Sequence, residues 1–306
     1  MNLSVLLVAR TPGLLLKNPV MTASGTFGYG TEYPHPFDIQ ELGAIVCKGT
    51  TLKPREGNPL PRVAETPAGM LNAIGLQNIG LESLLRGKAP VWAGWRVPVV
   101  VNIAGETEAE YAEIAAGLEG VKGISAIEVN ISCPNIRAGG AEFGAEPAPA
   151  ARVVGAVRAV TGLPLLVKLT PNTGNIVKVA EAVENAGADA LTVANTLKGM
   201  AIDVVRRRPV LGNSSGGLSG PAIRPVALYL VWQVAGAVSL PVIGCGGIST
   251  ARDALEFLMA GARAVQVGTA NLTSPEAPIE VLRGIESFLE KEGVRDIADI
   301  IGAARR

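Results

Sequence analysis

Histidine and cysteine are scarce in this 306-residue chain, which has a single histidine, His35. One histidine excludes a histidine-rich metal site, and a Ser-His-Asp triad would have to use it. The three cysteines, Cys47, Cys133 and Cys245, lie far apart in the sequence. They cannot fill a four-cysteine zinc or iron–sulfur site, so we expect no metal. The low cysteine content and the lack of a signal peptide predict a cytoplasmic protein.

An excess of charge of either sign is also absent. The 27 lysines and arginines balance the 27 aspartates and glutamates, so the net charge is +0. This balance argues against nucleic acid or an anionic membrane as the main partner. The apolar run at residues 3–9 is too short to span a bilayer. Charged residues make up 18% and hydrophobic residues 48%, which predicts a large buried core and an extensive subunit interface.

Short aliphatic runs alternate with longer stretches of helical period along the chain. This alternation predicts a (β/α)8 TIM barrel in one domain spanning residues 1–306, with a doubly wound open sheet as the alternative. The first residues predict a small β-hairpin around Thr11-Pro12-Gly13 that closes the N-terminal mouth of the barrel. The eight expected strands are residues 19–24, 44–48, 97–102, 125–130, 164–169, 190–195, 241–246 and 264–268. The clearest expected helices are residues 107–120, 148–162, 175–188, 224–238, 250–262 and 276–293.

Several local signals add detail to this plan. Thr107 and Glu110 predict a capping box at a helix start. Cys47 and Cys245 lie inside apolar strands, where a thiol is most often a small buried hydrophobic group. Trp92 and Trp95 belong to a "VWAGW" segment before the third strand, and the sequence does not separate a packing role from an interface role.

Polar side chains end five of the expected strands. Lys48 and Lys168 end two of them, and Asn102, Asn130 and Asn195 end three more. In a (β/α)8 barrel the chemistry lies at the C-terminal ends of the strands. Either lysine alone could extend its ammonium to water, but a buried ammonium is costly unless it is paired. Two lysines in register with three asparagines therefore indicate a polar site.

Glycine-rich loops follow the last two strands, at residues 244–249 and 268–270, and a further one spans residues 216–220. The loops after strands seven and eight are the usual phosphate site of such barrels, because bare backbone N–H groups meet the anion there. A phosphorylated cofactor is therefore expected. No G-x-G-x-x-G both follows a strand and opens a helix, so no dinucleotide-binding Rossmann unit is predicted.

Two cofactors fit these groups. Flavin mononucleotide (FMN) has one phosphate and a polar-edged ring, under which Asn102, Asn130 and Lys168 would lie. Pyridoxal phosphate would instead use Lys48 or Lys168 as a Schiff base. The chemistry of the residues leaves both open.

The order and length of the motifs are typical of one family. The segments "TASGTFGYG", "KGTTLKPREGNPLPRVAETPAGMLNAIGLQNIG", "VNISCPN", "VKLTPN", "ANTLKGM", "GGLSGPAI" and "GCGGI" resemble the class 1 dihydroorotate dehydrogenases. The resemblance runs from about Pro19 to Thr269 and is strongest to the FMN-containing catalytic subunit of the NAD-linked (1B) type. It implies oxidation of dihydroorotate to orotate in pyrimidine biosynthesis.

The resemblance also implies roles for residues. Cys133 would be the general base. The glycines after it, Gly139, Gly140 and Gly144, independently indicate either a mobile lid or a long surface loop. Implied flavin contacts are Ser24, Lys48, Gly49, Asn102, Asn130, Lys168, Ala194, Gly220, Gly246, Gly247, Gly268 and Thr269. Implied substrate contacts are Lys48, Asn72, Ala73, Ile74, Gly75, Leu76, Asn130, Asn195 and Thr196.

A second subunit is implied by the NAD-linked type, because the chain shows no dinucleotide fingerprint of its own. In that type the partner carries FAD and an iron–sulfur cluster, and a homodimer of catalytic subunits forms the core of a heterotetramer. A fumarate-linked homodimer is the alternative electron route. More distant alternatives are a tRNA-dihydrouridine synthase, which the neutral charge disfavours, and a non-catalytic flavin-binding subunit, which Cys133 and the two lysines disfavour.

Overall fold

Eight parallel strands form the centre of the molecule, which is described here from a computed structural model that covers residues 1–32, 34–131 and 143–306. The strand order is β3-β16-β15-β10-β9-β8-β7-β4, and a parallel bridge between Met21 and Ala44 joins β3 to β4. The sheet is therefore closed, which confirms the barrel and excludes the open sheet. The strands are β3 (Val20–Thr22), β4 (Ile45–Val46), β7 (Val99–Ile103), β8 (Ala126–Asn130), β9 (Leu165–Lys168), β10 (Ala190–Val193), β15 (Val242–Cys245) and β16 (Ala262–Val267).

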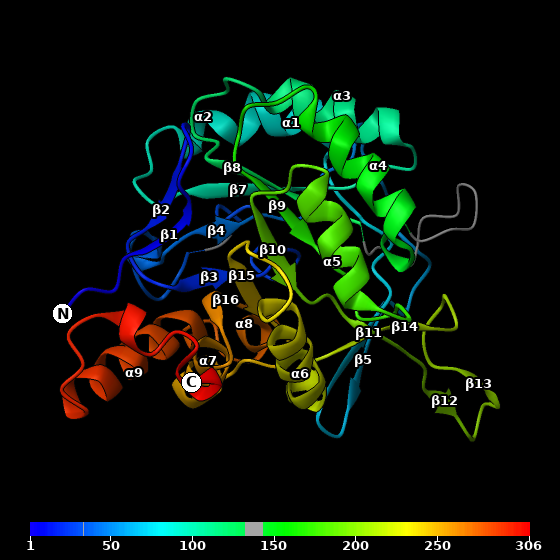
Figure 1. Ribbon diagram of the computed structural model, residues 1–306. Coiled ribbons are helices and arrows are strands. Elements are labelled where there is room, and N and C mark those ends of the chain that lie inside the picture. Colours follow the sequence, from blue (N-terminus) through cyan, green and yellow to red (C-terminus); the bar gives the residue numbers. More distant parts are fainter. Residues whose placement is uncertain (33, 132–142) are drawn as a thin grey trace.

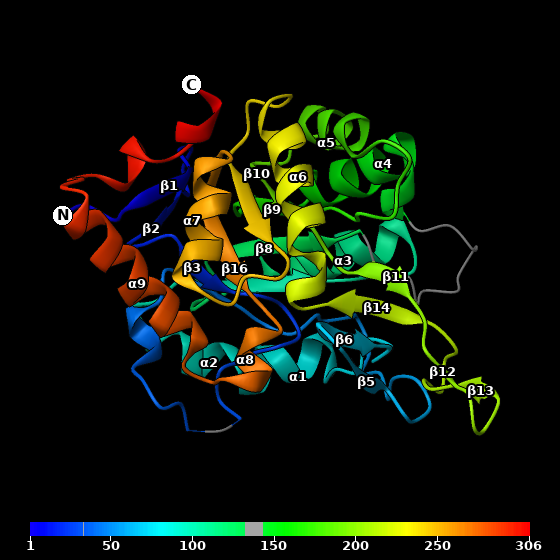
Figure 2. The same cartoon turned by 90° about the horizontal axis from the view of Figure 1, so that it is seen from below.

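Helices surround this barrel, as Figures 1 and 2 show. Their inner faces and the outer faces of the strands form one hydrophobic core, because parallel strands are covered by the helices that connect them. All six helices expected from the sequence are present. The helices are α1 (Gly80–Gly87), α2 (Ala89–Trp92), α3 (Glu108–Leu118), α4 (Pro147–Arg158), α5 (Ile176–Asn185), α6 (Arg224–Ala235), α7 (Ala251–Met259), α8 (Ala270–Thr273) and α9 (Ala277–Lys291). Within the described ranges no helix is long and apolar enough to cross a bilayer.

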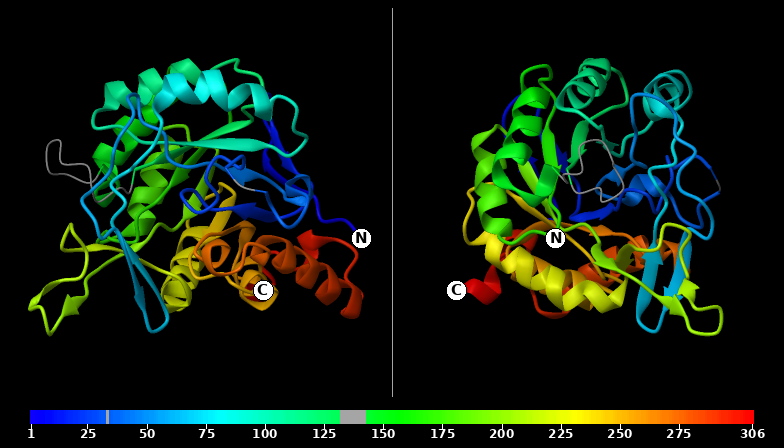
Figure 3. Two further views of the ribbon diagram at one scale, coloured as in Figure 1. Left: turned by 180° about the vertical axis from the view of Figure 1, so that it is seen from behind. Right: turned by 90° about the vertical axis from the view of Figure 1, so that its right-hand side faces the viewer.

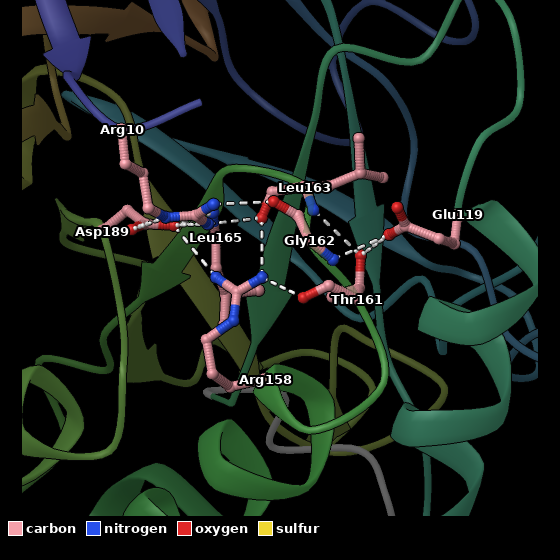
Figure 4. A network of polar contacts seen from close by, with 8 residues as sticks. All are labelled: Arg10, Glu119, Arg158, Thr161, Gly162, Leu163, Leu165 and Asp189. Carbon is pink, nitrogen blue, oxygen red and sulfur yellow. Dashed lines mark hydrogen bonds and ion pairs between the residues drawn. The ribbon is translucent and has the colours of Figure 1, made fainter. Parts of the chain in front are cut away.

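The N-terminal hairpin is present as predicted. Strand β1 (Val5–Val8) pairs antiparallel with β2 (Leu14–Leu16), and Arg10 lies in the connecting loop. Arg10 donates to both carboxylate oxygens of Asp189, at 2.6 and 2.5 Å, and to the carbonyls of Gly162 and Leu163 (Figure 4). These acceptors directly precede β9 and β10. The hairpin is thus fastened to the N-terminal end of the barrel.

A small antiparallel sheet, β11-β14-β6-β5, lies at the opposite end of the barrel (Figures 2 and 3). It was not predicted. Its strands are short, and glycine interrupts their apolar pattern. A local hairpin of β5 and β6 is joined to the rest of the sheet only by the pairing of β6 with β14, about 145 residues further along the chain. Its members are β5 (Val63–Thr66), β6 (Gly69–Asn72), β11 (Leu197–Gly199) and β14 (Gly216–Ser219), and a hairpin of β12 (Ile202–Asp203) and β13 (Arg208–Pro209) extends beyond it.

Two local predictions need correction or completion. Thr107 caps α3 by accepting from the backbone N–H of Glu110, but the Glu110 carboxylate accepts from Glu106 and not from Thr107. The predicted capping box is therefore only half formed, because the turn before α3 brings a different N–H within reach. Trp92 is a packing residue: it is 1% exposed, and its indole N–H donates to the Tyr29 carbonyl at 3.0 Å.

Candidate active site

A pocket opens at the C-terminal ends of the barrel strands, between the barrel and the small sheet. It brings together residues that are more than 200 positions apart in the sequence, because all parallel strands end at the same rim. Of the described residues that the resemblance implied, only Ala73 is outside its lining, buried beside Leu71 and Leu211. The lining includes Ser24, Lys48, Gly49, Asn72, Ile74, Gly75, Leu76, Asn102, Asn130, Lys168, Ala194, Asn195, Thr196, Gly220, Gly246, Gly247, Gly268 and Thr269.

Cys133, the expected general base, lies outside the described residues, as do Gly139 and Gly140. Strand β8 ends at Asn130, three residues before this thiol. Asn130 itself lines the pocket, and its backbone carbonyl accepts a hydrogen bond from the Tyr111 hydroxyl at 2.7 Å. The chain therefore enters the Cys133 segment from the rim of the pocket.

Lys168 stands on the floor of the pocket and is 3% exposed. Its ammonium donates to Gln266 Oε1 at 3.2 Å and Ser24 Oγ at 3.4 Å, and lies 3.9 Å from Glu128 Oε1. Burial alone would lower the pKa of Lys168, but the adjacent Cys245 and Glu128 outweigh burial and raise the pKa above its ordinary value. Lys168 is thus a buried cation at neutral pH.

Lys48 occupies the same pocket in a different electrostatic setting. Strand β4 ends at Val46, so Lys48 follows the strand by two residues instead of ending it, and its backbone N–H donates to the Gly28 carbonyl. Burial and the nearby Arg62 lower the pKa of Lys48, and no hydrogen bond or ion pair holds its ammonium among the described residues. An anionic ligand beside this ammonium would favour its charged form and raise its pKa again.

Asparagine side chains form an amide wall of the same pocket. Asn195 Nδ2 donates to Asn130 Oδ1 at 3.3 Å, and Asn195 Oδ1 accepts from the backbone N–H of Thr196. Asn72, now seen on β6, donates to the Gly217 carbonyl across the small sheet. Amides present both donors and acceptors, so this wall suits a planar ligand with ring N–H groups and carbonyls.

Backbone N–H groups cluster at the end of the pocket formed by β15 and β16. Among the described residues, the N–H groups of Gly246, Gly247, Gly268 and Thr269 have no acceptor. Gly247 has φ +75°, and a Cβ there would lie 2.8 Å from the backbone nitrogen of Arg224, so the loop needs glycine. Free N–H groups in a glycine loop are a binding arrangement for phosphate.

Three buried polar residues below the pocket were missed in the sequence analysis. Glu128, Thr192 and Gln266 are each 0% exposed, on β8, β10 and β16. Each stands in the middle of an otherwise apolar strand, as in "AIEVN" and "AVQV". That signal was available, because a charged or amide side chain at a core position must be hydrogen-bonded. Cys245 was placed correctly as a buried thiol, but it also lines the pocket.

Comparison with known proteins shows the family to which the chain belongs. The sequence profile of the family described as "Dihydroorotate dehydrogenase" matches residues 6–289. The chain belongs to the dihydroorotate dehydrogenase family. This family is flavin-dependent. The fold also agrees: a crystal structure titled as a DHODH in complex with ferulenol, from Eimeria tenella, superposes with a TM-score of 0.81 at 22% identity, covering 98% of this chain and 89% of that one.

Curated members of the family are similar over nearly their whole length. The chain is 60% identical over 294 residues to the "Dihydroorotate dehydrogenase B (NAD(+)), catalytic subunit" of Desulforudis audaxviator, covering 96% of each chain. It is 57% identical over 290 residues to the protein of the same name from Trichlorobacter lovleyi, covering 95% of each chain. The resemblance stated from the motifs is thereby confirmed.

Proposed function

We propose that this chain oxidises dihydroorotate to orotate in pyrimidine biosynthesis, as the FMN-containing catalytic subunit of an NAD-linked enzyme. The observation that carries the proposal is that one pocket combines three features: free backbone N–H groups in glycine loops, a buried cation and a wall of amides. This pocket is found in a member of the dihydroorotate dehydrogenase family. One FMN-binding domain would then span residues 1–306.

The lining of the pocket supports FMN as the bound flavin. The free N–H groups of Gly246, Gly247, Gly268 and Thr269 would hold the phosphate. Asn102 is 1% exposed, and its Oδ1 has no hydrogen-bond partner among the described residues, so it is left for a donor such as a ring N–H. Lys168 would stabilise negative charge on the ring. Lys168 is a poor Schiff-base lysine, because its neighbours raise its pKa and a Schiff base needs a neutral amine. The lowered pKa of Lys48 does not disfavour a Schiff base there, so the preference for a flavin over pyridoxal phosphate comes from membership of a flavin-dependent family.

The residues of the chain would divide the reaction as follows. Lys48 binds the substrate carboxylate, and Asn130 and Asn195 bind its ring carbonyls and N–H groups. Cys133 removes a proton from C5 of dihydroorotate, and the C5=C6 double bond of orotate forms as a hydride leaves C6. The flavin supplies the acceptor for that hydride. Ser24 and Gln266 hold the Lys168 ammonium in place.

A partner subunit would receive the electrons. The relatives are named as NAD(+)-linked catalytic subunits, which supports a second subunit and does not favour the fumarate route. We propose that the partner carries FAD and an iron–sulfur cluster, that two subunits of each kind form a heterotetramer, and that the assembly is cytoplasmic.

Anaerobic titration tests the proposal. Dihydroorotate added to the FMN-loaded chain should bleach the visible flavin absorbance, and orotate should form in equal amount. NAD should reoxidise the flavin only when the partner is present. A protein that takes up no flavin, or a bound flavin that dihydroorotate leaves oxidised, would contradict the activity; rapid reoxidation by fumarate alone would contradict the NAD-linked route.

A further inference from the structure

Glu128 is a buried carboxylate for which the reaction described above has no use. It is 0% exposed on β8, two residues before Asn130. It accepts hydrogen bonds from Asn102 Nδ2 at 2.8 Å, from Thr192 Oγ1 at 2.8 Å and from Gln266 Nε2 at 2.6 Å. All its hydrogen-bonding neighbours are donors, and an ionised carboxylate is the side chain that only accepts.

This acceptor fixes the direction of two amides. An amide has an oxygen at one end and an NH₂ group at the other, and its neighbours decide which end points where. Asn102 and Gln266 both turn their NH₂ groups to Glu128. The Gln266 oxygen is thereby turned to Lys168, from which it accepts at 3.2 Å.

The fixed directions of these two amides decide which polar atoms of Asn102 and Lys168 remain available to a ligand. With its NH₂ held by Glu128, Asn102 is left with an oxygen that has no partner among the described residues. That oxygen lies 3.0 Å from where a Cβ on Gly49 would stand, and both Gly49 and Asn102 line the pocket. Lys168, which Gln266 positions, lines it too. Glu128 itself does not line the pocket, so it acts only through these neighbours.

We propose that Glu128 is a positioning residue that turns the Asn102 oxygen toward the bound flavin and, through Gln266, holds the Lys168 ammonium beside it. The inference rests on the proposed function, since the ligand whose ring N–H meets the oxygen is the flavin.

Glu128→Gln gives the direct test, because it keeps the shape but replaces one acceptor oxygen with an NH₂ group. If that group faces Asn102, the Asn102 amide must turn and present NH₂ to the ligand. If it faces Gln266, that amide must turn NH₂ toward Lys168. We expect the dissociation constant of FMN from the reconstituted apoprotein to rise at least tenfold, measured by flavin fluorescence. We expect the midpoint potential of the bound flavin to become more positive, because a buried negative charge is lost.

Thr192→Val is the matched control. It removes a third donor to the same carboxylate, but Thr192 does not line the pocket and neither amide has to turn. Its FMN dissociation constant should stay within twofold of wild type, and its potential should be unchanged. Equal effects of E128Q and T192V on FMN affinity and on the midpoint potential would show a merely structural role and overturn the proposal. An E128Q protein that binds FMN like wild type would also overturn it.

Asn102→Asp combined with E128Q keeps the test decisive if E128Q does not fold. In this double variant the new amide at position 128 can donate its NH₂ to the new carboxylate at position 102. The amide oxygen at position 128 can still accept from Thr192 and Gln266, and an oxygen at position 102 still meets the ligand. We expect the FMN dissociation constant of the double variant to stay within fivefold of wild type. A dissociation constant raised tenfold or more would overturn the proposal. A wild-type chain without flavin would instead refute the proposed function.

Discussion

Lys168 and Glu128 form a buried ion pair at the centre of the barrel, with Lys168 Nζ 3.9 Å from Glu128 Oε1 and side chains that are 4% and 0% exposed. Removing one partner of a buried pair leaves a charge uncompensated, which costs about 3 kcal/mol or more. We expect Lys168→Met to lower the free energy of unfolding of the apoprotein by about 3 kcal/mol, measured by denaturant titration. K168M combined with E128Q should recover part of that loss. A K168M apoprotein as stable as wild type would contradict the pairing.

The pH dependence of this pair follows from the raised pKa of Lys168. A raised folded-state pKa stabilises the folded protein fully below the unfolded value near 10.5, and the stabilisation is lost as the pH rises through the higher folded value. The stability difference between wild type and K168M should therefore be constant from about pH 6 to 9 and shrink only in stronger alkali.

The pKa of Lys48 is shifted in the opposite direction to that of Lys168. Its folded-state pKa is lowered, chiefly by burial, so the folded protein binds this proton less readily than the unfolded chain does. The free energy of unfolding should rise as the pH increases from the folded pKa toward 10.5. Lys48→Met should remove that rise in the ligand-free protein, whereas Lys53→Met, at an exposed lysine, should keep it. Identical pH profiles of thermal unfolding for K48M and wild type would be against this account.

The base assignment of Cys133 predicts a variant with a functional flavin site and almost no turnover. Cys133→Ala should bind FMN like wild type, because none of the residues proposed to hold FMN lies in the Cys133 segment. Dihydroorotate should bleach the flavin at least ~10²-fold more slowly, the usual contribution of a positioned base. Cys133→Ser should lie between the two.

Cys47→Ala is the control for the loss of a thiol. Burial raises the pKa of Cys47 to about 12, so this thiol stays neutral and cannot serve as a base near pH 7. Its replacement should leave the bleaching rate unchanged. Near-normal bleaching by the Cys133→Ala variant would exclude Cys133 as the base.

The barrel could be predicted because each strand can be recognised from its local sequence alone. Most strands are short, largely aliphatic runs near whose end a polar residue stands, such as Lys168 or Asn130. The small sheet could not, since its two local pairs, β5–β6 and β11–β14, are joined only by the pairing of Asn72 with Gly217, far apart in the sequence. Glu128 was overlooked for a similar reason. Its place in an apolar strand was visible, but its partners, Thr192 and Gln266, come from strands 64 and 138 residues away.

If Gly247 holds the FMN phosphate as proposed, its replacement should cause a binding defect that is specific to the phosphate. Gly247→Ala should shift the loop, because the new Cβ meets the backbone of Arg224 and φ is +75°. The preference for FMN over riboflavin, measured as the ratio of dissociation constants, should fall at least tenfold, with little change in riboflavin affinity. Gly155→Ala, in helix α4, is the control. Apart from the nearby backbone of its own helix, no atom lies within 4 Å of a Cβ placed there, so it should keep the preference and add about 0.5–1 kcal/mol of stability. An unchanged preference in G247A would place the phosphate elsewhere.

Replacing Arg10 should lower the stability of the protein without weakening FMN binding. Arg10→Ala removes a two-pronged contact with Asp189 and two hydrogen bonds to carbonyls, and frees the hairpin from the barrel (Figure 4). We expect the free energy of unfolding to fall by about 2 kcal/mol, a modest value because Arg158 and the Leu165 N–H still donate to Asp189. FMN affinity should not change, since the network lies at the other end of the strands. Arg86→Ala, which breaks a pair with Glu82 whose side chains are 80% and 74% exposed, should cost under about 0.5 kcal/mol. Equal losses in the two variants would mean that the hairpin contact contributes no more than a surface ion pair.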